Sequence, residues 1–147
     1  INPKIHIQYA SIASFEREYW KFNLHELAQY RNADICILKI SENISKDSLD
    51  KRQFLKHYGD LVSYLAGDGS TKMIISEGFW PSPVNDKIKT YALSKGYPFV
   101  QLQDLYSNQS AYTAYGLFEN EGVAAHPSDE GMKQISDRIW EKLKNLL

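Results

Sequence analysis

The stretch "GVAAHPSDEGM", residues 122–132, places a histidine directly before the expected start of a helix. His126 is followed by Pro127, and Ser128 is a residue type that commonly caps a helix N-terminus. A single loop histidine is usually a solvated surface residue. It is also the side chain whose unperturbed pKa best suits proton transfer near neutral pH. The stretch therefore leaves two interpretations of His126 open, a surface residue and a general base.

Three other loops carry groups that could serve acyl transfer, which needs a nucleophile, a base and hydrogen-bond donors for the developing oxyanion. The side-chain amide of Asn43, just after the apolar run "DICILKI", is one candidate donor. Backbone N–H groups of the small residues in "YASIAS", around Ala10, are another. Phe79 and Trp80 in "EGFWPSP" could wall a binding site. Each also has an ordinary role, Asn43 as a turn residue and the aromatic pair as core beneath a loop.

Alternating strands and helices must position these loops. The expected strands are residues 4–8, 34–40, 72–76 and 98–102, and the expected helices are 14–30, 46–67, 86–96 and 128–147. This order predicts an α/β fold with a parallel sheet and helices on both faces. The loops 9–13, 41–46, 77–85 and 103–126 then meet at the carboxyl edge of the sheet, where sites in such folds lie. All of residues 1–147 are expected to form one domain.

The composition limits the classes of partner. With 43% hydrophobic residues, 24% charged residues and a net charge of −1, the chain has no basic excess that would indicate nucleic acid. It has no run of about 18 apolar residues that could span a membrane. It has neither metal-ligand spacing nor a glycine-rich phosphate loop, so we expect no metal and no cofactor. The aromatic content of 13%, rich in tyrosine, indicates a carbohydrate or interaction surface.

The single cysteine, Cys36, lies in the apolar strand 34–40, where we expect a small buried hydrophobe rather than a reactive thiol. One cysteine does not fix the compartment, and we favour a secreted or periplasmic location over the cytoplasm. Because the sequence starts at Ile1 rather than at a methionine, we expect that a leader, a tag or a piece of the domain was removed upstream.

Two stretches, "DICILKISENI" and "VAAHPSDEGMKQISDRIWEKL", resemble conserved blocks of the SGNH (GDSL) hydrolases. These are flavodoxin-like α/β/α esterases and lipases whose four blocks carry, in order, a serine nucleophile, an oxyanion-hole glycine, an oxyanion-hole asparagine and a late histidine. "YASIASFEREY" resembles a branch with Trp-Gly-Met-Ala-Ala-Ser before an acidic-aromatic helix. The resemblance extends from residue 5 onward. It implies that His126 is the catalytic base and Asn43 an oxyanion donor, with Ala10 at the glycine position.

The chain departs from the family pattern beside both of these residues. Val123 stands where the family has an aspartate that orients the histidine. Orientation of His126 must then come from a backbone carbonyl or another carboxylate, of which Glu119 is the nearest. Ser41 and Ile44 replace the usual glycine and aspartate around Asn43.

The first family block, a strand that ends in Gly-Asp/Asn-Ser, has no counterpart in the sequence. Ser11 and Ser14 fall in the second block and lack a Gly-x-Ser turn. We therefore expect the nucleophilic serine on a segment upstream of residue 1, and a sheet that is incomplete at its N-terminal side. Such an open sheet edge could pair with the missing part of the domain supplied as a separate chain.

Two functions remain as expectations. The first is a serine esterase acting on a small-molecule ester, including an acylated carbohydrate. The second is a catalytically degenerate SGNH-like domain that binds carbohydrate or a protein partner. An unrelated flavodoxin-like binding domain is a third alternative, but no phosphate loop supports it.

Overall fold

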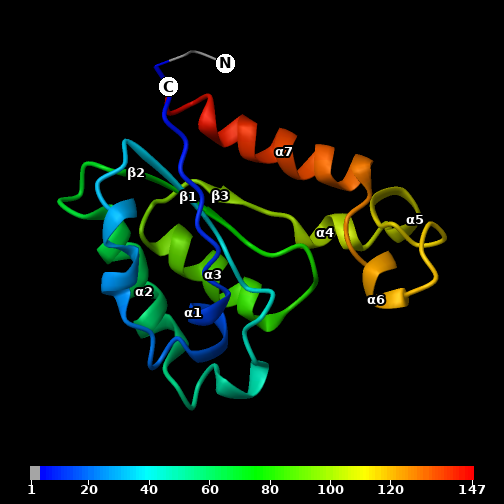
Figure 1. Ribbon diagram of the computed structural model, residues 1–147, viewed down its shortest axis with the longest axis horizontal. Coiled ribbons are helices and arrows are strands. Elements are labelled where there is room, and N and C mark those ends of the chain that lie inside the picture. The colour runs from blue at the N-terminus through cyan, green and yellow to red at the C-terminus, as the bar shows by residue number, and fades with distance from the viewer. Residues whose placement is uncertain (1–3) are drawn as a thin grey trace.

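A parallel β-sheet lies at the centre of the fold in the computed structural model, which describes residues 4–147 (Figure 1). Within these residues the sheet has three strands, in the order β1 (Ile35–Lys39), β2 (Lys72–Ser76) and β3 (Phe99–Val100). β1 pairs with β2 along its whole length, and β3 pairs with the end of β2. The α/β class and the parallel pairing predicted from the sequence are confirmed.

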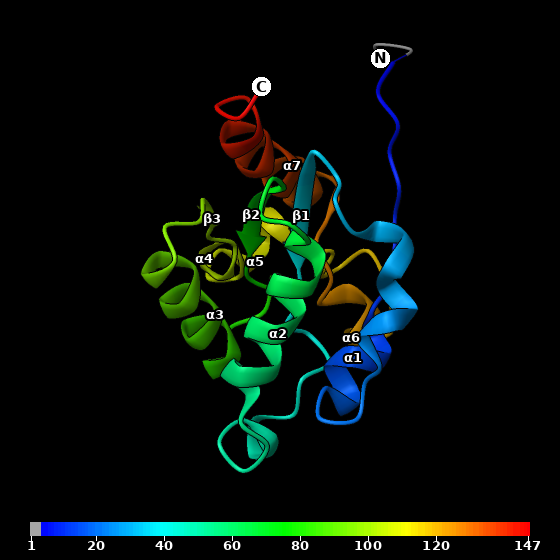
Figure 2. The ribbon, with the colours of Figure 1, turned by 90° about the vertical axis from the view of Figure 1, so that its left-hand side faces the viewer.

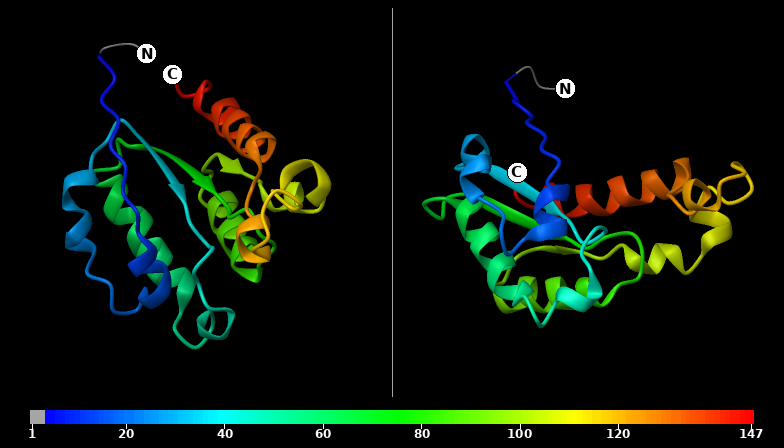
Figure 3. Two further views of the ribbon diagram at one scale, coloured as in Figure 1. Left: turned by 45° about the vertical axis from the view of Figure 1, so that its right-hand side comes forward. Right: turned by 60° about the horizontal axis from the view of Figure 1, so that its bottom comes forward.

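Helices connect the strands and continue the chain beyond them. They are α1 (Ala13–Glu18), α2 (Phe54–Ala66), α3 (Pro83–Ser94), α4 (Gln103–Tyr106), α5 (Gln109–Tyr112), α6 (Glu121–Ala124) and α7 (Asp129–Leu143), with the 3₁₀ segments η1 (Leu24–Tyr30) and η2 (Lys46–Ser48). α2 and α3 are the crossovers between successive parallel strands. The short helices α4, α5 and α6 lie together beyond the carboxyl ends of the strands (Figures 1 and 3).

Both faces of the sheet are covered by helices (Figure 2). On one face, α2 and α3 pack against Met73 and Ile75 in one apolar cluster. On the other face, Ile135 of α7 packs in a second cluster with Ile74 and Val100. Successive residues of a strand point to opposite faces, so the apolar run of β2 fills both clusters.

Residues 4–8 do not form the strand that their alternating pattern predicts. The segment is extended, Ile5 is 55% exposed and Ile7 is 74% exposed, and no described strand pairs with it. A strand needs a neighbour to satisfy its backbone hydrogen-bonding groups, so an alternating pattern alone does not create one. The strand prediction for 4–8 is therefore wrong.

Two predicted helices are divided by local backbone chemistry. The expected helix 14–30 separates into α1 and η1 because the side chain of Asn23 accepts the N–H of His25 and starts a new turn. The expected helix 46–67 separates into η2 and α2 at Gln53, whose φ of 51° places it in the left-handed region. Helical periodicity predicted the segments but not these interruptions.

The last strand is shorter than the predicted range 98–102. The carboxylate of Glu77 accepts the N–H groups of Leu102 and Gln103, each at 2.7 Å, and so directs these groups away from strand pairing. The following region, 103–126, predicted to lack regular structure, instead contains α4, α5 and α6. These short helices carry the chain from β3 to His126.

Candidate active site

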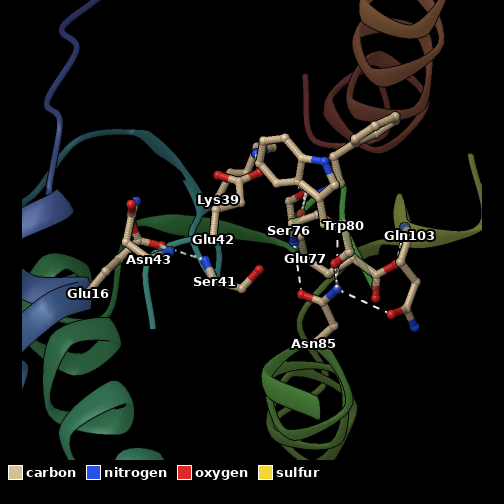
Figure 4. A network of polar contacts seen from close by, with 12 residues as sticks. Glu16, Lys39, Ser41, Glu42, Asn43, Ser76, Glu77, Trp80, Asn85 and Gln103 are labelled. Atoms are coloured by element: carbon tan, nitrogen blue, oxygen red, sulfur yellow. Dashed lines mark hydrogen bonds and ion pairs between the residues drawn. The ribbon is translucent and has the colours of Figure 1, made fainter. Parts of the chain in front are cut away.

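The loops that follow β1 and β2 are held against each other at the carboxyl edge of the sheet (Figure 4). The carboxylate of Glu42 accepts the N–H of Phe79 at 3.3 Å and also pairs with Lys39. Gly78 lies so close to Ser41 that an added Cβ would come within 2.1 Å of the serine Oγ. Glycine at 78 therefore allows the two loops to approach closely.

Asn43 is oriented by a buried carboxylate from α1. Glu16 is 5% exposed, and one of its oxygens lies 2.7 Å from Asn43 Nδ2 (Figure 4). Its other oxygen accepts the N–H of Ser41 at 2.7 Å and that of Asn43 at 3.5 Å. A side-chain amide has two N–H donors. One of these N–H groups donates to Glu16, and the other has no hydrogen-bond partner among residues 4–147. Asn43 itself is exposed.

The loop between β2 and α3 is built around a buried asparagine. Asn85 is fully buried and accepts the N–H of Gly78 at 3.1 Å. Its amide donates to Trp80 O at 2.9 Å and to Gln103 Oε1 at 3.2 Å. Ser82 caps α3 by accepting the N–H of Val84. These bonds give residues 77–82 a fixed backbone that presents the indole of Trp80.

Trp80 contacts the predicted base directly. Its indole Nε1 donates to Ala125 O at 3.0 Å. Its ring meets the imidazole of His126 edge-on, with centroids 4.9 Å apart and planes at 88°. The loop after β2 and the loop before α7 are therefore in contact through this aromatic pair.

His126 has one ring nitrogen bound to the backbone and the other available. Nδ1 lies 2.8 Å from Gly122 O and 3.2 Å from Val123 O. Carbonyl oxygens only accept hydrogen bonds, so Nδ1 carries the proton and Nε2 is the basic nitrogen. The backbone of His126 is fixed in turn, because its carbonyl accepts the N–H of Ala114 at 3.0 Å.

The other candidate residues predicted from the sequence differ in their exposure to solvent and in their position. Phe79 is 1% exposed and packs in the second apolar cluster, whereas Trp80 is half-buried. Glu119 is exposed and makes no hydrogen bond to the imidazole within the described residues. Ala10 lies in the extended chain just before α1, the helix that carries Glu16.

Sequence reasoning missed the polar residues that support the site, Glu16, Asn85 and Glu77. Each reads as an ordinary helix or loop residue, and each is buried only because a distant loop closes over it. Burial raises the pKa of Glu77 despite the two N–H groups that it accepts. Its Oε2 has no hydrogen-bond partner among the described residues.

Several other features limit the chemistry of the described residues. No hydroxyl group among residues 4–147 hydrogen-bonds to His126, and the buried Oγ of Ser41 has no partner there. In the same part of the chain, no group of three or more His, Cys, Asp or Glu side chains could hold a metal ion. Burial raises the pKa of Cys36, which lowers its thiolate fraction. Among residues 4–147, every helix is too short or too polar to span a lipid bilayer.

Comparisons with protein-family models, with curated proteins and with solved structures find no match to this chain. The function must therefore be argued from the site itself.

Proposed function

We propose that this chain supplies the base and the oxyanion donors of a serine ester hydrolase of the SGNH (GDSL) type, with a flavodoxin-like arrangement. The observation that carries the proposal is the state of His126. Its Nδ1–H is held by Gly122 O, which leaves Nε2 as a proton acceptor beside the half-buried Trp80 ring. Asn43 offers a free amide N–H from the loop after β1.

The proposed reaction has a serine on a segment outside residues 4–147 as nucleophile. Its Oγ attacks the ester carbonyl carbon while Nε2 of His126 takes the hydroxyl proton. Asn43 and a backbone N–H near Ala10 donate hydrogen bonds to the oxyanion that forms. When the C–O bond breaks, His126 returns the proton to the leaving alcohol. Water activated by the same imidazole then releases the acid and regenerates the serine.

The carbonyl that replaces the family aspartate has a definite consequence. Gly122 O fixes the tautomer of His126 as an aspartate would, because both accept the Nδ1 proton. A neutral carbonyl stabilises the imidazolium less than a carboxylate does, because the carbonyl presents only a dipole whereas the carboxylate carries a full negative charge. This arrangement suits an activated or small acyl ester.

An acetylated carbohydrate is a natural substrate, because the half-buried Trp80 ring offers an apolar face to a sugar.

The test is hydrolysis of p-nitrophenyl acetate and of acetylated sugars by the full-length product of the gene. We expect His126→Ala to lower kcat by about 100-fold or more, the usual contribution of a general base. His25→Ala is the matched control, since His25 is also exposed but contacts Tyr64, away from Asn43 and Trp80. Equal hydrolysis by the wild-type protein and His126→Ala would contradict the proposal.

A second candidate is a binding domain without catalysis. It is favoured by one observation, that no hydroxyl of the described residues reaches His126. In that case Trp80, Asn43 and His126 would hold an acetylated sugar without cleaving it. Titration calorimetry with an assay for released acetate distinguishes the two candidates. A binding domain gives a heat of binding without release of acetate, whereas an esterase releases acetate.

A further inference from the structure

The proton on Nδ1 of His126 is held by backbone carbonyls near the end of α6. Gly122 O lies 2.8 Å from Nδ1, and Val123 O lies 3.2 Å from it. The last carbonyl groups of a helix lack donors within the helix, so they can bind a side chain. The position of these carbonyls, and with it the orientation of the imidazole, therefore depends on whether α6 forms.

α6 gains little stability from length or from burial. It has four residues, and isolated helices shorter than about 12 residues are marginal in water. Of these residues only Ala124 is buried, whereas Glu121, Gly122 and Val123 are exposed. The hydrogen bonds at the two ends of α6 must therefore decide whether this helix forms.

The C-terminal end of α6 is fixed by Pro127 and Trp80. Proline disfavours the helical conformation in the residue before it, so the helix ends before His126. The indole Nε1 of Trp80 donates to Ala125 O at 3.0 Å, and the N–H of His126 donates to Val123 O at 3.1 Å. These contacts connect the end of α6 to the residues of the proposed site.

The N-terminal end of α6 is fixed by Asn120. Its side-chain Oδ1 accepts the N–H of Val123 at 3.1 Å, and its carbonyl accepts the N–H of Ala124 at 2.9 Å. The first N–H groups of a helix lack acceptors within the helix, and an asparagine at this position supplies one. Glycine at 122 leaves space for this contact, because a Cβ there would lie 3.1 Å from Asn120 Oδ1.

Asn120 and His126 bind opposite sides of the same peptide group. The carbonyl of Gly122 and the N–H of Val123 belong to one peptide bond, which is planar and rigid. Asn120 Oδ1 accepts this N–H, and the imidazole Nδ1 donates to this carbonyl. A hydrogen bond to the N–H also polarises the carbonyl, because linked hydrogen bonds strengthen one another. The side chain of Asn120 thus fixes Gly122 O and makes it a stronger acceptor.

We propose that Asn120 is a positioning residue, which holds His126 in its Nδ1–H tautomer through the peptide group between Gly122 and Val123. With the proton on Nδ1, Nε2 keeps the free electron pair that can accept a proton from a nucleophile. The effect of Asn120 on catalysis rests on the proposed function. Its effect on the tautomer follows from the hydrogen bonds alone.

The tautomer can be measured by NMR without any substrate. Proton–nitrogen correlation spectra of the full-length gene product, at a pH where the imidazole is neutral, distinguish the protonated ring nitrogen from the bare one. The signals of His126 are assigned by their absence in His126→Ala. We expect the Nδ1–H form in the wild-type protein. In Asn120→Ala the ratio of Nδ1–H to Nε2–H should fall by about 5-fold, the usual effect of a lost cap on a local equilibrium.

Two further variants control for a general structural defect. Asn120→Asp keeps the acceptor and should keep the wild-type ratio. Asn108 is also exposed and also precedes a four-residue helix, α5, but its side chain makes no capping bond. Asn108→Ala should therefore leave the tautomer unchanged. The inference is overturned by an unchanged ratio in Asn120→Ala, by an equal fall in Asn120→Asp or Asn108→Ala, or by an Nε2–H tautomer in the wild-type protein.

Hydrogen exchange on the unmodified protein keeps the inference testable if Asn120→Ala does not fold. The amide of Val123 donates to Asn120, whereas that of Gly122 has no acceptor among residues 4–147. We expect the amide of Val123 to exchange about 10-fold or more slowly than that of Gly122. Equal exchange at the two amides overturns the role of Asn120.

Hydrolysis of p-nitrophenyl acetate separates this inference from the proposed function. We expect Asn120→Ala to lower kcat by about 5-fold with little change in KM, and Asn120→Asp to retain the wild-type kcat. A tautomer that depends on Asn120 in a wild-type protein without esterase activity supports the inference and contradicts the proposed function. Hydrolysis that depends on His126, with a tautomer that Asn120→Ala does not change, does the reverse.

Discussion

The orientation of Asn43 depends on a carboxylate from a helix far away in the sequence. Glu16 contacts both the side-chain amide of Asn43 and the backbone on either side of Glu42. An asparagine without such a partner can turn its oxygen, rather than its nitrogen, towards a substrate. Glu16 is thus a positioning residue for the proposed oxyanion donor, since it acts through Asn43 and not on the substrate.

Replacing Glu16 by glutamine tests this role. The glutamine keeps one acceptor for Ser41 N–H but turns an NH₂ group towards Asn43 Nδ2, which favours rotation of the asparagine amide. We expect kcat on p-nitrophenyl acetate to fall by about 100-fold, the usual cost of losing one oxyanion donor, with little change in KM. Glu18→Gln, an exposed change in the same helix, should leave kcat unchanged.

A double mutant separates positioning from a general structural defect. In an Asn43→Ala background, Glu16→Gln should cost little further activity, because the group that Glu16 positions is already absent. Losses that multiply in the double mutant would show that Glu16 acts independently of Asn43.

At the scale of elements, the loop between β2 and α3 depends on Asn85. Its side chain is fully buried and bonds to the backbone of Gly78 and Trp80. Asn85→Ala leaves these groups unpaired, and we expect a loss of about 1–3 kcal/mol in the free energy of unfolding. Urea denaturation measures this loss. Asn108→Ala, an exposed change, is the control, and an equal effect in the two variants would contradict the role of Asn85.

Glu77, whose carboxylate accepts two N–H groups at the start of α4, should make stability depend on pH. Burial raises the pKa of Glu77, so the folded protein binds this proton more tightly than the unfolded chain does. The contribution of protonated Glu77 to the free energy of unfolding is fully present below the pKa of the unfolded state. This contribution is lost as the pH rises through the pKa of the folded state. The free energy of unfolding of Glu77→Gln, relative to that of the wild-type protein, should therefore increase as the pH is raised from acid to neutral. Parallel pH profiles of the two proteins in urea unfolding would contradict this account.

Across the whole molecule, a chain of contacts joins four segments that are far apart in the sequence. Glu16 in α1 holds Asn43 after β1, and Glu42 of the same loop holds the backbone of Phe79 after β2. Trp80 then contacts His126 before α7. The elements of an α/β fold thus bring His126, the proposed base, and Asn43, one candidate oxyanion donor, to one edge of the sheet.

The sequence predicted the parts of this arrangement that local pattern controls. The strands β1 and β2 were recognisable as short apolar runs, although Ile37 of β1 is 43% exposed. The helices α2 and α7 were recognisable by the helical spacing of their apolar residues. Residues 4–8 were predicted wrongly, since a strand also requires a neighbour. The burial of Glu16 and Asn85 could not be predicted, because it arises only when distant loops close over these side chains.

In the proposed mechanism, His126 activates a serine that lies outside residues 4–147. A fluorophosphonate ester tests it most directly, since it reacts covalently with a serine only when a base has activated the hydroxyl group. In the full-length gene product, mass spectrometry should find one labelled serine outside residues 4–147, and the label should be lost in His126→Ala and kept in His25→Ala. Absence of label in the wild-type protein, or equal labelling in His126→Ala, would contradict the account.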